Sequence, residues 1–305
     1  MEHAIDDGQR HAGGGKEVWT LGRIMDWSAR FLKDKGITSA RLDVELLLSH
    51  CLNVKRIELY TNYDRPLTPS ERDSFKDLLR QRAAGTPVAY IIGVKNFMGL
   101  DFRVTPDVLI PRSDTEVIVE TVLAEYSKEQ PLKVLDVGLG SGCLAIALAH
   151  YLPQAEVAGW EVTPQALAVA QENADRLLTR PVMFGQRDAL LAESWQGDRL
   201  FDLVVSNPPY IATDDPEVAA EVRAFEPERA LFASDHGLAF YKTFATHAGN
   251  VLKPDGRLLV EIGYQQGNSV REIFQAEGWR EVTILPDLSG HDRVISALSG
   301  KSEAS

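Results

Sequence analysis

The sequence predicts an α/β protein whose mostly parallel sheet is covered by helices and is preceded by a small helical domain. From residue 131 onward, short apolar runs of strand length alternate with longer segments of helical periodicity. Such alternation is typical of parallel strands joined by crossover helices on both faces of a sheet. Between residues 18 and 84, apolar side chains recur at helical spacing, which indicates a separate helix bundle.

The composition argues against several classes of protein. Of 305 residues, 44% are hydrophobic, so the chain can bury the core of one or two domains. The net charge of −12 disfavours direct binding of nucleic acid, although a local basic patch is compatible with it. The seven histidines and two cysteines have no metal-ligand spacing, so we expect no metal site. No apolar run approaches about 20 residues, so we expect no membrane segment.

The beginning of the chain reads as a tail. Residues 1–17 contain three consecutive glycines and no apolar stretch, which predicts a disordered segment rather than a signal peptide. Two cysteines far apart in sequence, Cys51 and Cys143, fit a reducing compartment. We therefore expect a cytoplasmic protein.

Residues 18–85 are expected to form a helical N-terminal domain. Apolar side chains follow helical spacing over 19–32 and again over 44–48. Thr68 is a suitable N-cap for a third helix, because proline follows it and Glu71 stands three positions on. The segment offers no catalytic constellation, so we assign it to substrate recognition or support.

Residues 86–110 change in character and are expected to form a β-hairpin linker. Prolines and glycines separate two short β-rich runs, 90–92 and 102–104. A second domain is then expected over 111–305.

The second domain carries the alternating pattern. Ser113 or Asp114 is expected to cap its first helix, which runs through residues 117–122. Seven strands are predicted, at 134–137, 157–160, 182–184, 203–205, 258–262, 281–285 and 293–297. The helices predicted between them cover 143–150, 164–178, 237–252 and 266–276.

A glycine-rich loop follows the first of these strands. Its residues are Gly138, Leu139, Gly140, Ser141 and Gly142. Glycines let a backbone approach a ligand closely, and the following helix offers unpaired N–H groups. Dinucleotide enzymes use a similar loop, but they require a further glycine or alanine where this chain has Cys143. Asp136, just before the loop, would repel a pyrophosphate and could hold a cationic amino group. The pattern favours a nucleoside that lacks a diphosphate.

Two more acids end the next two strands. Glu161 follows the second strand, where a carboxylate can accept both hydroxyls of a ribose. Asp188 follows the third strand, where it could reach an adenine amino group. The competing interpretation of each is a solvated loop acid, and this alternative is stronger for Asp188 than for Glu161. The three acids together suit a nucleoside that carries an amino acid and a sulfonium.

The fourth strand stops at Asn207-Pro208-Pro209-Tyr210. Two prolines cannot continue a sheet because they have no N–H to donate, so Asn207 stands at a carboxyl strand end, where α/β sheets bind ligands. An ordinary strand-to-loop turn is the competing interpretation, since asparagine and proline are common in turns.

These motifs resemble those of class I S-adenosylmethionine methyltransferases that act on amino groups. A longer match is similar to the HemK/PrmC family. Its segments are Thr86 to Gly93, Phe97 to Gly99, Leu109 to Glu116, Ser206 to Ile211, Glu226-Pro227 with Ala230-Leu231, and Glu261 to Gly263. The chain departs from the family pattern at Ser113, often proline there, and at Ala189, often aromatic. The second departure leaves open how the adenine is covered.

The resemblance implies a Rossmann-like fold with a seven-stranded sheet, and S-adenosylmethionine as cofactor. It also implies methylation of the glutamine side-chain amide in the Gly-Gly-Gln motif of peptide-chain release factors. Cofactor residues would be the acids and the loop named above, with Ala189 and Asn207. A ribosomal protein glutamine or an adenine of DNA or RNA remains an alternative methyl acceptor, and we expect a monomer.

Our mechanistic hypothesis concerns the Asn-Pro-Pro-Tyr turn. The side-chain oxygen of Asn207 and the carbonyl of Pro208 would accept the two N–H groups of the substrate amide. Pro209 would keep the turn free of a competing donor, and Tyr210 would pack on the amide plane. Arg112 could contact substrate, although a plain surface arginine fits equally well. Glu261, at the end of the fifth strand, is expected to be structural rather than catalytic.

Overall fold

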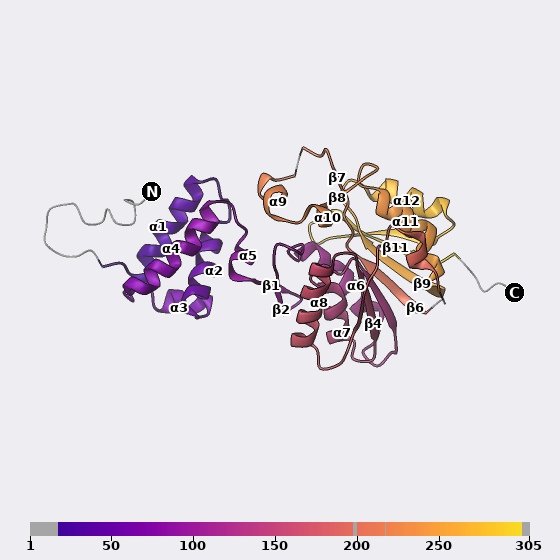
Figure 1. The fold of residues 1–305 in the computed structure, drawn as a ribbon, viewed down its shortest axis with the longest axis horizontal. Helices are drawn as coiled ribbons and strands as arrows, with labels where there is room; N and C mark the ends of the chain where they lie inside the picture. Colours follow the sequence, from indigo (N-terminus) through magenta and orange to yellow (C-terminus); the bar gives the residue numbers. More distant parts are fainter. Residues whose placement is uncertain (1–17, 198–199, 217, 301–305) are drawn as a thin grey trace. The chain divides into compact units, whose positions relative to one another are not determined.

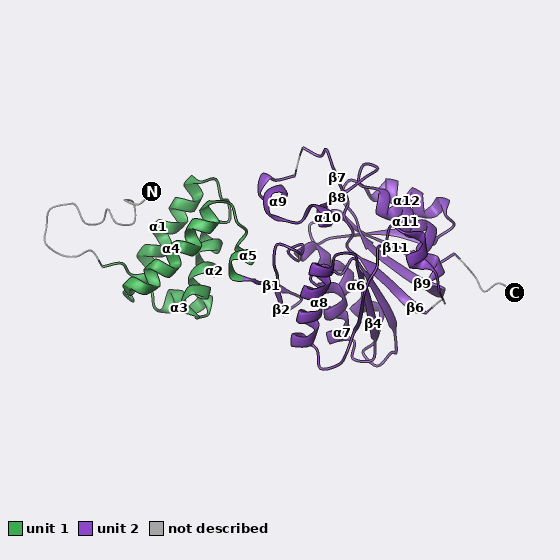
Figure 2. Cartoon of the chain, viewed as in Figure 1, with its two compact units in different colours: residues 1–92 green, residues 93–305 purple. Residues whose placement is uncertain are grey.

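The computed structural model describes residues 18–197, 200–216 and 218–300. The chain divides into two compact units, Met1–Ile92 and Gly93–Ser305 (Figure 2). This division falls inside the linker expected over 86–110, and the tail expected over 1–17 lies outside the described residues. Among the described residues, no helix combines the length and apolar character needed to cross a membrane.

Unit 1 is helical, as predicted. Its helices are α1 (Leu21–Asp34), α2 (Ala40–Leu52), α3 (Arg56–Thr61), α4 (Pro69–Ala83) and α5 (Val88–Ile92) (Figure 1). The apolar stripes meet in one core that includes Met25, Leu47 and Phe75, all nearly inaccessible to solvent. The predicted start of α4 is confirmed: the Thr68 hydroxyl accepts from the backbone of Glu71, whose carboxylate accepts from the backbone of Thr68.

The expected strand at 90–92 is wrong, because these residues belong to α5. The backbone N–H groups of Tyr90 and Ile91 both donate to the carbonyl of Pro87, at 3.0 and 3.1 Å. Apolar side chains of this turn pack against the unit 1 core, and that packing outweighs their β propensity. Gly93 then breaks the helix with a φ of +73°.

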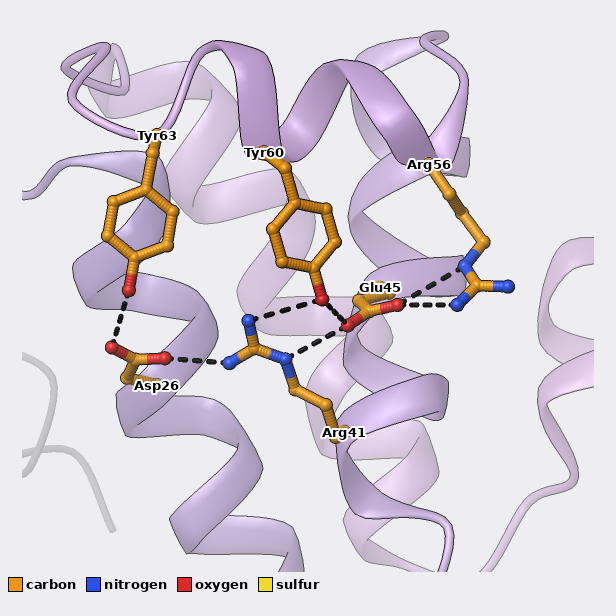
Figure 3. Close-up of polar contacts among 6 residues, drawn as sticks. All are labelled: Asp26, Arg41, Glu45, Arg56, Tyr60 and Tyr63. Carbon is orange, nitrogen blue, oxygen red and sulfur yellow. Dashed lines mark hydrogen bonds and ion pairs between the residues drawn. The ribbon is translucent and has the colours of Figure 1, made fainter.

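A buried carboxylate ties together three helices of unit 1 (Figure 3). Glu45 of α2 accepts hydrogen bonds from Tyr60 and Arg56 of α3 and from Arg41, one turn earlier in α2. Arg41 also reaches Asp26 of α1, which in turn accepts from Tyr63 at 2.7 Å. Burial alone would raise the pKa of Glu45, but the bonds from its three partners outweigh burial and lower it.

Unit 2 begins with a hairpin and continues into the sheet. The hairpin pairs β1 (Val94–Phe97) with β2 (Leu100–Arg103) across a Met98-Gly99 turn in which both residues have positive φ. In sheet order, the large sheet comprises β10 (Arg280–Pro286), β11 (Asp292–Leu298), β9 (Leu252–Glu261), β6 (Phe201–Ser206), β3 (Lys133–Val137), β4 (Glu156–Glu161) and β5 (Met183–Gln186). The predicted mostly parallel, seven-stranded sheet is confirmed, with β11 antiparallel to both of its neighbours.

Helices cover both faces of this sheet (Figure 1). Alternate residues of β3 enter different cores: Val134 packs with α6, α7 and α8, whereas Leu135 packs with α11 and α12. The bounds are α6 (Glu116–Glu125), α7 (Cys143–Tyr151), α8 (Pro164–Leu177), α11 (Ala239–His247) and α12 (Gly267–Ala276). Smaller elements are η2 (Ser113–Thr115), η3 (Ala192–Trp195), η4 (Ala248–Asn250), α9 (Ala220–Phe225), α10 (Glu228–Leu231), and the parallel pair β7 (Ile211–Ala212) and β8 (Phe232–Ala233).

The start of α6 differs from the prediction that Ser113 or Asp114 caps it. These residues lie in the 3₁₀ turn η2, and Thr115 occupies the N-cap position without capping through its side chain. The Thr115 hydroxyl instead donates to Glu261 at 2.6 Å. A tertiary hydrogen bond has therefore displaced the local cap.

The Glu45 network predicts a difference between two tyrosines. Tyr60→Phe removes a donor to a buried carboxylate, so we expect α2 and α3 to lose about 1–2 kcal/mol of local stability. Tyr63→Phe removes a donor to Asp26, whose side chain is 49% exposed, and water replaces it at little cost. Native-state hydrogen exchange of α2 and α3 peptides measures both effects. Equal losses in the two variants would refute the role given to Glu45.

Candidate active site

The strand order brings two loops of the second unit together. β3 lies between β4 and β6, and all three run parallel, so their carboxyl ends share one edge. The chain adds β4 and β5 on one side of β3 and β6 on the other, which makes the β3/β6 boundary the switch point where α/β sheets bind ligands. The glycine loop follows β3, and the Asn-Pro-Pro-Tyr turn follows β6.

A cavity of about 490 Å³ opens at this edge. The predicted site residues that line it are Arg112, Asp136, Gly138, Leu139, Gly140, Ser141, Glu161, Asp188, Ala189, Asn207, Pro208 and Pro209. Two predicted residues do not line it: Gly142 is the N-cap of α7, and Tyr210 lines a second cavity. The sequence analysis missed further lining residues, among them Thr115, Trp160, Arg187, Phe240 and Phe244.

The glycine loop needs its glycines for conformation and for packing. Gly138, Gly140 and Gly142 have φ values of +83°, +52° and +79°, which side-chain-bearing residues rarely adopt. A Cβ on Gly142 would also lie 2.9 Å from the Ile146 side chain. The loop is held to β4 by N–H groups of Gly138 and Leu139, which donate to the Trp160 carbonyl at 2.8 and 3.0 Å.

Asp136 is a buried carboxylate with one oxygen unused. Its Oδ2 accepts from the backbone N–H of Ala145 at 3.0 Å, whereas Oδ1 has no hydrogen-bond partner among the described residues. Burial, together with the charge of Glu161, raises the pKa of Asp136 to about 8, despite the bond from Ala145. A buried acceptor without a partner is costly, so this oxygen suits the cationic amino group of an amino acid ligand.

Glu161 is held rigidly by its own strand end. Its Oε2 accepts from the Gly140 N–H at 3.0 Å, and Oε1 accepts from both the N–H and the hydroxyl of Thr163. Three of the about four lone-pair sites of a carboxylate are therefore occupied. One ribose hydroxyl can be accepted here without rearrangement, which is less than the two expected from the sequence.

Asp188 and Ala189 form one end of the cavity beside aromatic rings. Asp188 Oδ1 accepts from the backbone of Leu190 at 2.9 Å, and within the part of the chain that the structure describes no donor reaches Oδ2. The Ala189 carbonyl accepts from the indole of Trp195, which packs edge-on against Trp160 and Phe244 at centroid separations of 5.1 and 5.5 Å. Aromatic side chains from β4 and α11 thus line the cavity although position 189 is alanine. The sequence analysis missed Phe240 and Phe244 because they lie far from position 189 along the chain.

The Asn-Pro-Pro-Tyr turn separates the first cavity from a second of about 480 Å³. Asn207 lines both, and Tyr210 lines the second. The turn is fixed by its surroundings: Gln266 donates to the Tyr210 carbonyl at 3.0 Å, and a Cβ on Gly237 would lie 2.2 Å from that oxygen.

A hydrogen-bonded chain joins the turn to the end of β9. Asn207 Nδ2 donates to the Thr115 hydroxyl at 3.0 Å, Thr115 donates to Glu261, and the Tyr210 hydroxyl donates to the other oxygen of Glu261 at 3.2 Å. Among the described residues, none donates to Asn207 Oδ1. The sequence analysis gave Thr115 no role and expected Glu261 to be structural rather than catalytic, because nothing local links positions 115, 207 and 261.

Arg112 also lines both cavities. Its guanidinium is paired at 2.5 Å with Glu226, a carboxylate whose side chain is 2% exposed. Glu226 accepts a second bond from the backbone of Ile110 at 3.3 Å. Arg112 is therefore anchored at the cavity rim and is not a plain surface arginine. Among the residues the structure describes, no group of three or more histidine, cysteine, aspartate or glutamate side chains is placed to hold a metal ion.

The fold and the site define a class I methyltransferase that uses S-adenosylmethionine as cofactor. Residues 23–93 match the PrmC N-terminal domain, and residues 128–279 match a methyltransferase domain. The chain is 45% identical to a release factor glutamine methyltransferase of Geobacter sulfurreducens over 93% of this chain and 98% of that protein. It is 41% identical to the enzyme of that name in Moorella thermoacetica, over 91% of this chain and 98% of that protein. The chain belongs to the release factor glutamine methyltransferase family.

Among solved structures, the chain is similar to a methyltransferase from Pyrococcus furiosus. The two are 16% identical, with a TM-score of 0.48 and coverage of 74% of this chain and 98% of that one. This similarity is too weak to support an inference about function.

From the raised pKa of Asp136, we predict that cofactor binding releases a proton. At pH 7, a carboxyl with a pKa of about 8 is mostly protonated, and pairing with an ammonium group requires its ionised form. Calorimetry at pH 7 in two buffers of different ionisation enthalpy is expected to give heats that depend on the buffer.

Asp136→Asn is expected to abolish this dependence and to weaken S-adenosylmethionine binding by about 10–100-fold, as for a lost charged hydrogen bond. Asp188→Asn is the matched control and is expected to keep the proton release. Buffer-independent heats in the unmodified protein would contradict the assignment.

Proposed function

We propose that the protein transfers a methyl group from S-adenosylmethionine to the glutamine side-chain amide of the Gly-Gly-Gln motif in peptide-chain release factors. The observation that carries this proposal is the position of Asn207 on the boundary of two cavities. One cavity is lined by the acids and glycines suited to the cofactor, and the other is lined by Tyr210 and the residues that follow it. The relatives described above carry the same activity in their names.

The chemistry requires positioning rather than a strong base. S-adenosylmethionine supplies a methyl group on a sulfonium sulfur, which departs as a neutral thioether. The acceptor amide nitrogen gains the methyl group and gives up one proton to solvent. An amide nitrogen is a poor nucleophile because its lone pair is delocalised into the carbonyl. Holding that nitrogen in line is therefore the main task of the site, and orientation can supply about 7–11 kcal/mol in favourable cases.

Asn207 and Pro208 are proposed to hold the acceptor amide. An amide NH₂ has two donors, so it requires two acceptors, and Asn207 Oδ1 together with the Pro208 carbonyl provides them. Because Pro208 and Pro209 have no N–H, the turn presents no competing backbone donor at these positions. We assign Tyr210 to packing against the amide plane, and its place in the second cavity supports this role.

The remaining roles follow from the lining of the first cavity. We assign Asp136 to the cofactor amino group, Glu161 to a ribose hydroxyl and Asp188 to the adenine amino group. The glycine loop would bring its backbone against the amino acid portion. Arg112, anchored by Glu226, is proposed to contact the segment next to the acceptor glutamine.

Unit 1 is proposed to recognise the release factor. It matches the PrmC N-terminal domain, whereas the catalytic groups proposed here all lie in unit 2. We propose a monomer, and a substrate that acts in translation suggests the cytoplasm. We propose no role in direct binding of nucleic acid, in keeping with the net charge of −12, and none at a membrane.

Asn207→Ala tests the proposal. We expect kcat for methylation of a release factor to fall by about 100-fold or more, because the acceptor amide loses its alignment. The affinity for S-adenosylmethionine should change little, since the acids that face the cofactor are untouched. Mass spectrometry of the Gly-Gly-Gln peptide reports the methyl group, and calorimetry reports cofactor binding.

Three outcomes would count against the proposal. A release factor that gains no CH₂ unit when incubated with the unmodified protein and cofactor would exclude this substrate. Labelled methyl transfer to DNA in the same assay would favour adenine as acceptor. Equal loss of cofactor binding and turnover in Asn207→Ala would remove Asn207 from the acceptor subsite.

A further inference from the structure

The side-chain amide of Asn207 can serve the proposed reaction in one orientation and not in the other. Its oxygen accepts hydrogen bonds, whereas its NH₂ group only donates. The acceptor glutamine also approaches through an NH₂ group, so an Asn207 turned by 180° would bring two sets of donors together. Rotating the side chain this way changes no packing, because the two ends are nearly equal in size. Some other group must therefore select the orientation.

Thr115 is the group that distinguishes the two ends of the amide. A hydroxyl has one proton, and Thr115 donates it to Glu261 at 2.6 Å, within the range of a charge-assisted bond. The Thr115 oxygen can then only accept, and it accepts from Asn207 Nδ2 at 3.0 Å. Thr115 and Glu261 are each 1% exposed, so water cannot supply an alternative partner.

Glu261 sets the direction of the whole chain of bonds. Its second oxygen accepts from the Tyr210 hydroxyl, so the same carboxylate holds both polar side chains of the Asn-Pro-Pro-Tyr turn. An ionised carboxylate accepts at both oxygens, and this forces each neighbour to donate. The end of β9 thus determines the hydrogen-bond polarity of a turn 51 to 54 residues earlier in sequence.

We propose that Thr115 and Glu261 are positioning residues that hold the Asn207 amide with its oxygen toward the methyl acceptor. This inference rests on the proposed function, because it assumes that Asn207 receives an N–H from the acceptor.

The charge state of Glu261 then controls the site. Burial raises its pKa to about 7, while the bonds from Thr115 and Tyr210 and the charge of Arg293 oppose the rise. The ionisable groups that act on Glu261 or Tyr210 are Arg293 on β11, Asp114 in η2, Tyr210, Tyr241 on α11, Cys143 on α7 and Arg112. Once Glu261 is protonated, Thr115 loses its obligatory acceptor and can donate to Asn207, which frees the amide to turn.

At saturating cofactor, we expect kcat to rise as pH increases through about 7, because ionised Glu261 is the active form. The raised pKa also means that ionising Glu261 costs folding stability, which falls as pH rises from the ordinary carboxyl pKa of 4.5 to about 7. Activity and stability therefore move in opposite directions with pH. A residue that only supports the fold would not produce this opposition.

Variants of the intact chain distinguish the effect of the Thr115 hydroxyl from the effect of side-chain volume. Thr115→Val keeps the volume and removes the hydroxyl, and we expect kcat to fall about tenfold or more with little change in cofactor affinity. Thr115→Ser restores the hydroxyl and is expected to recover most of the lost rate. Glu261→Gln is expected to lower kcat and to remove the pH step. Thr121→Val lies in α6, the helix that Thr115 precedes, and its hydroxyl is bonded to the backbone of Val117, so it is the matched control with unchanged kcat.

Selective ¹⁵N labelling of asparagine supplies a readout that does not depend on the methyl acceptor. The side-chain NH₂ signal of Asn207, assigned from its loss in Asn207→Ala, should shift with a midpoint near pH 7, and this shift should disappear in Glu261→Gln. If kcat for Thr115→Val stays within about twofold of the unmodified protein, or Thr115→Ser is equally impaired, the inference is wrong. If the unmodified protein transfers no methyl group to release factor while the signal shifts as described, the proposed function fails and the positioning role stands.

Discussion

The parallel pairing of β3 with β6 is the constraint on which the site depends. Asp136 lies opposite Val205 in this pair, so the loop after β3 and the turn after β6 begin at the same edge of the sheet. Neither segment forms a site by itself: one carries glycines and acids, and the other carries acceptors and an aromatic ring. Their adjacency converts two short motifs into neighbouring cavities that meet at Asn207.

Buried carboxylates have different roles in different parts of the molecule, and their hydrogen-bond partners determine each role. Glu45 in unit 1 has an arginine donor at each oxygen and a tyrosine donor at one of them, and its role is to hold helices together. Asp136 has one oxygen that finds no partner among the described residues, which leaves it suited to a cationic ligand. Glu261 accepts from two side chains of the site and sets their direction. The same chemical group thus stabilises, binds or orients according to the donors around it.

Much of the fold was predictable because its signals are local. Strand-length apolar runs alternating with helical stripes predicted the seven strands, and the Thr68 cap was readable from four consecutive residues. The prediction was wrong where tertiary contacts outweighed local preference. Residues 90–92 have β propensity but pack as a helical turn on the unit 1 core. The cap of α6 predicted at Ser113 or Asp114 is absent, because Thr115 takes the N-cap position and bonds to Glu261. The short pair β7 and β8 had no pattern long enough to detect.

The sequence by itself determined the class of chemistry, since acids and glycines at strand ends and the Asn-Pro-Pro-Tyr turn are readable without coordinates. Tertiary structure alone decided how these groups are oriented and what supports them. The bond from Thr115 to Glu261 spans 146 residues, and the aromatic rings of α11 enter a cavity defined by β3 and β4. Hydrogen-bond direction depends on which donors and acceptors surround a group in space, and no linear pattern carries that information.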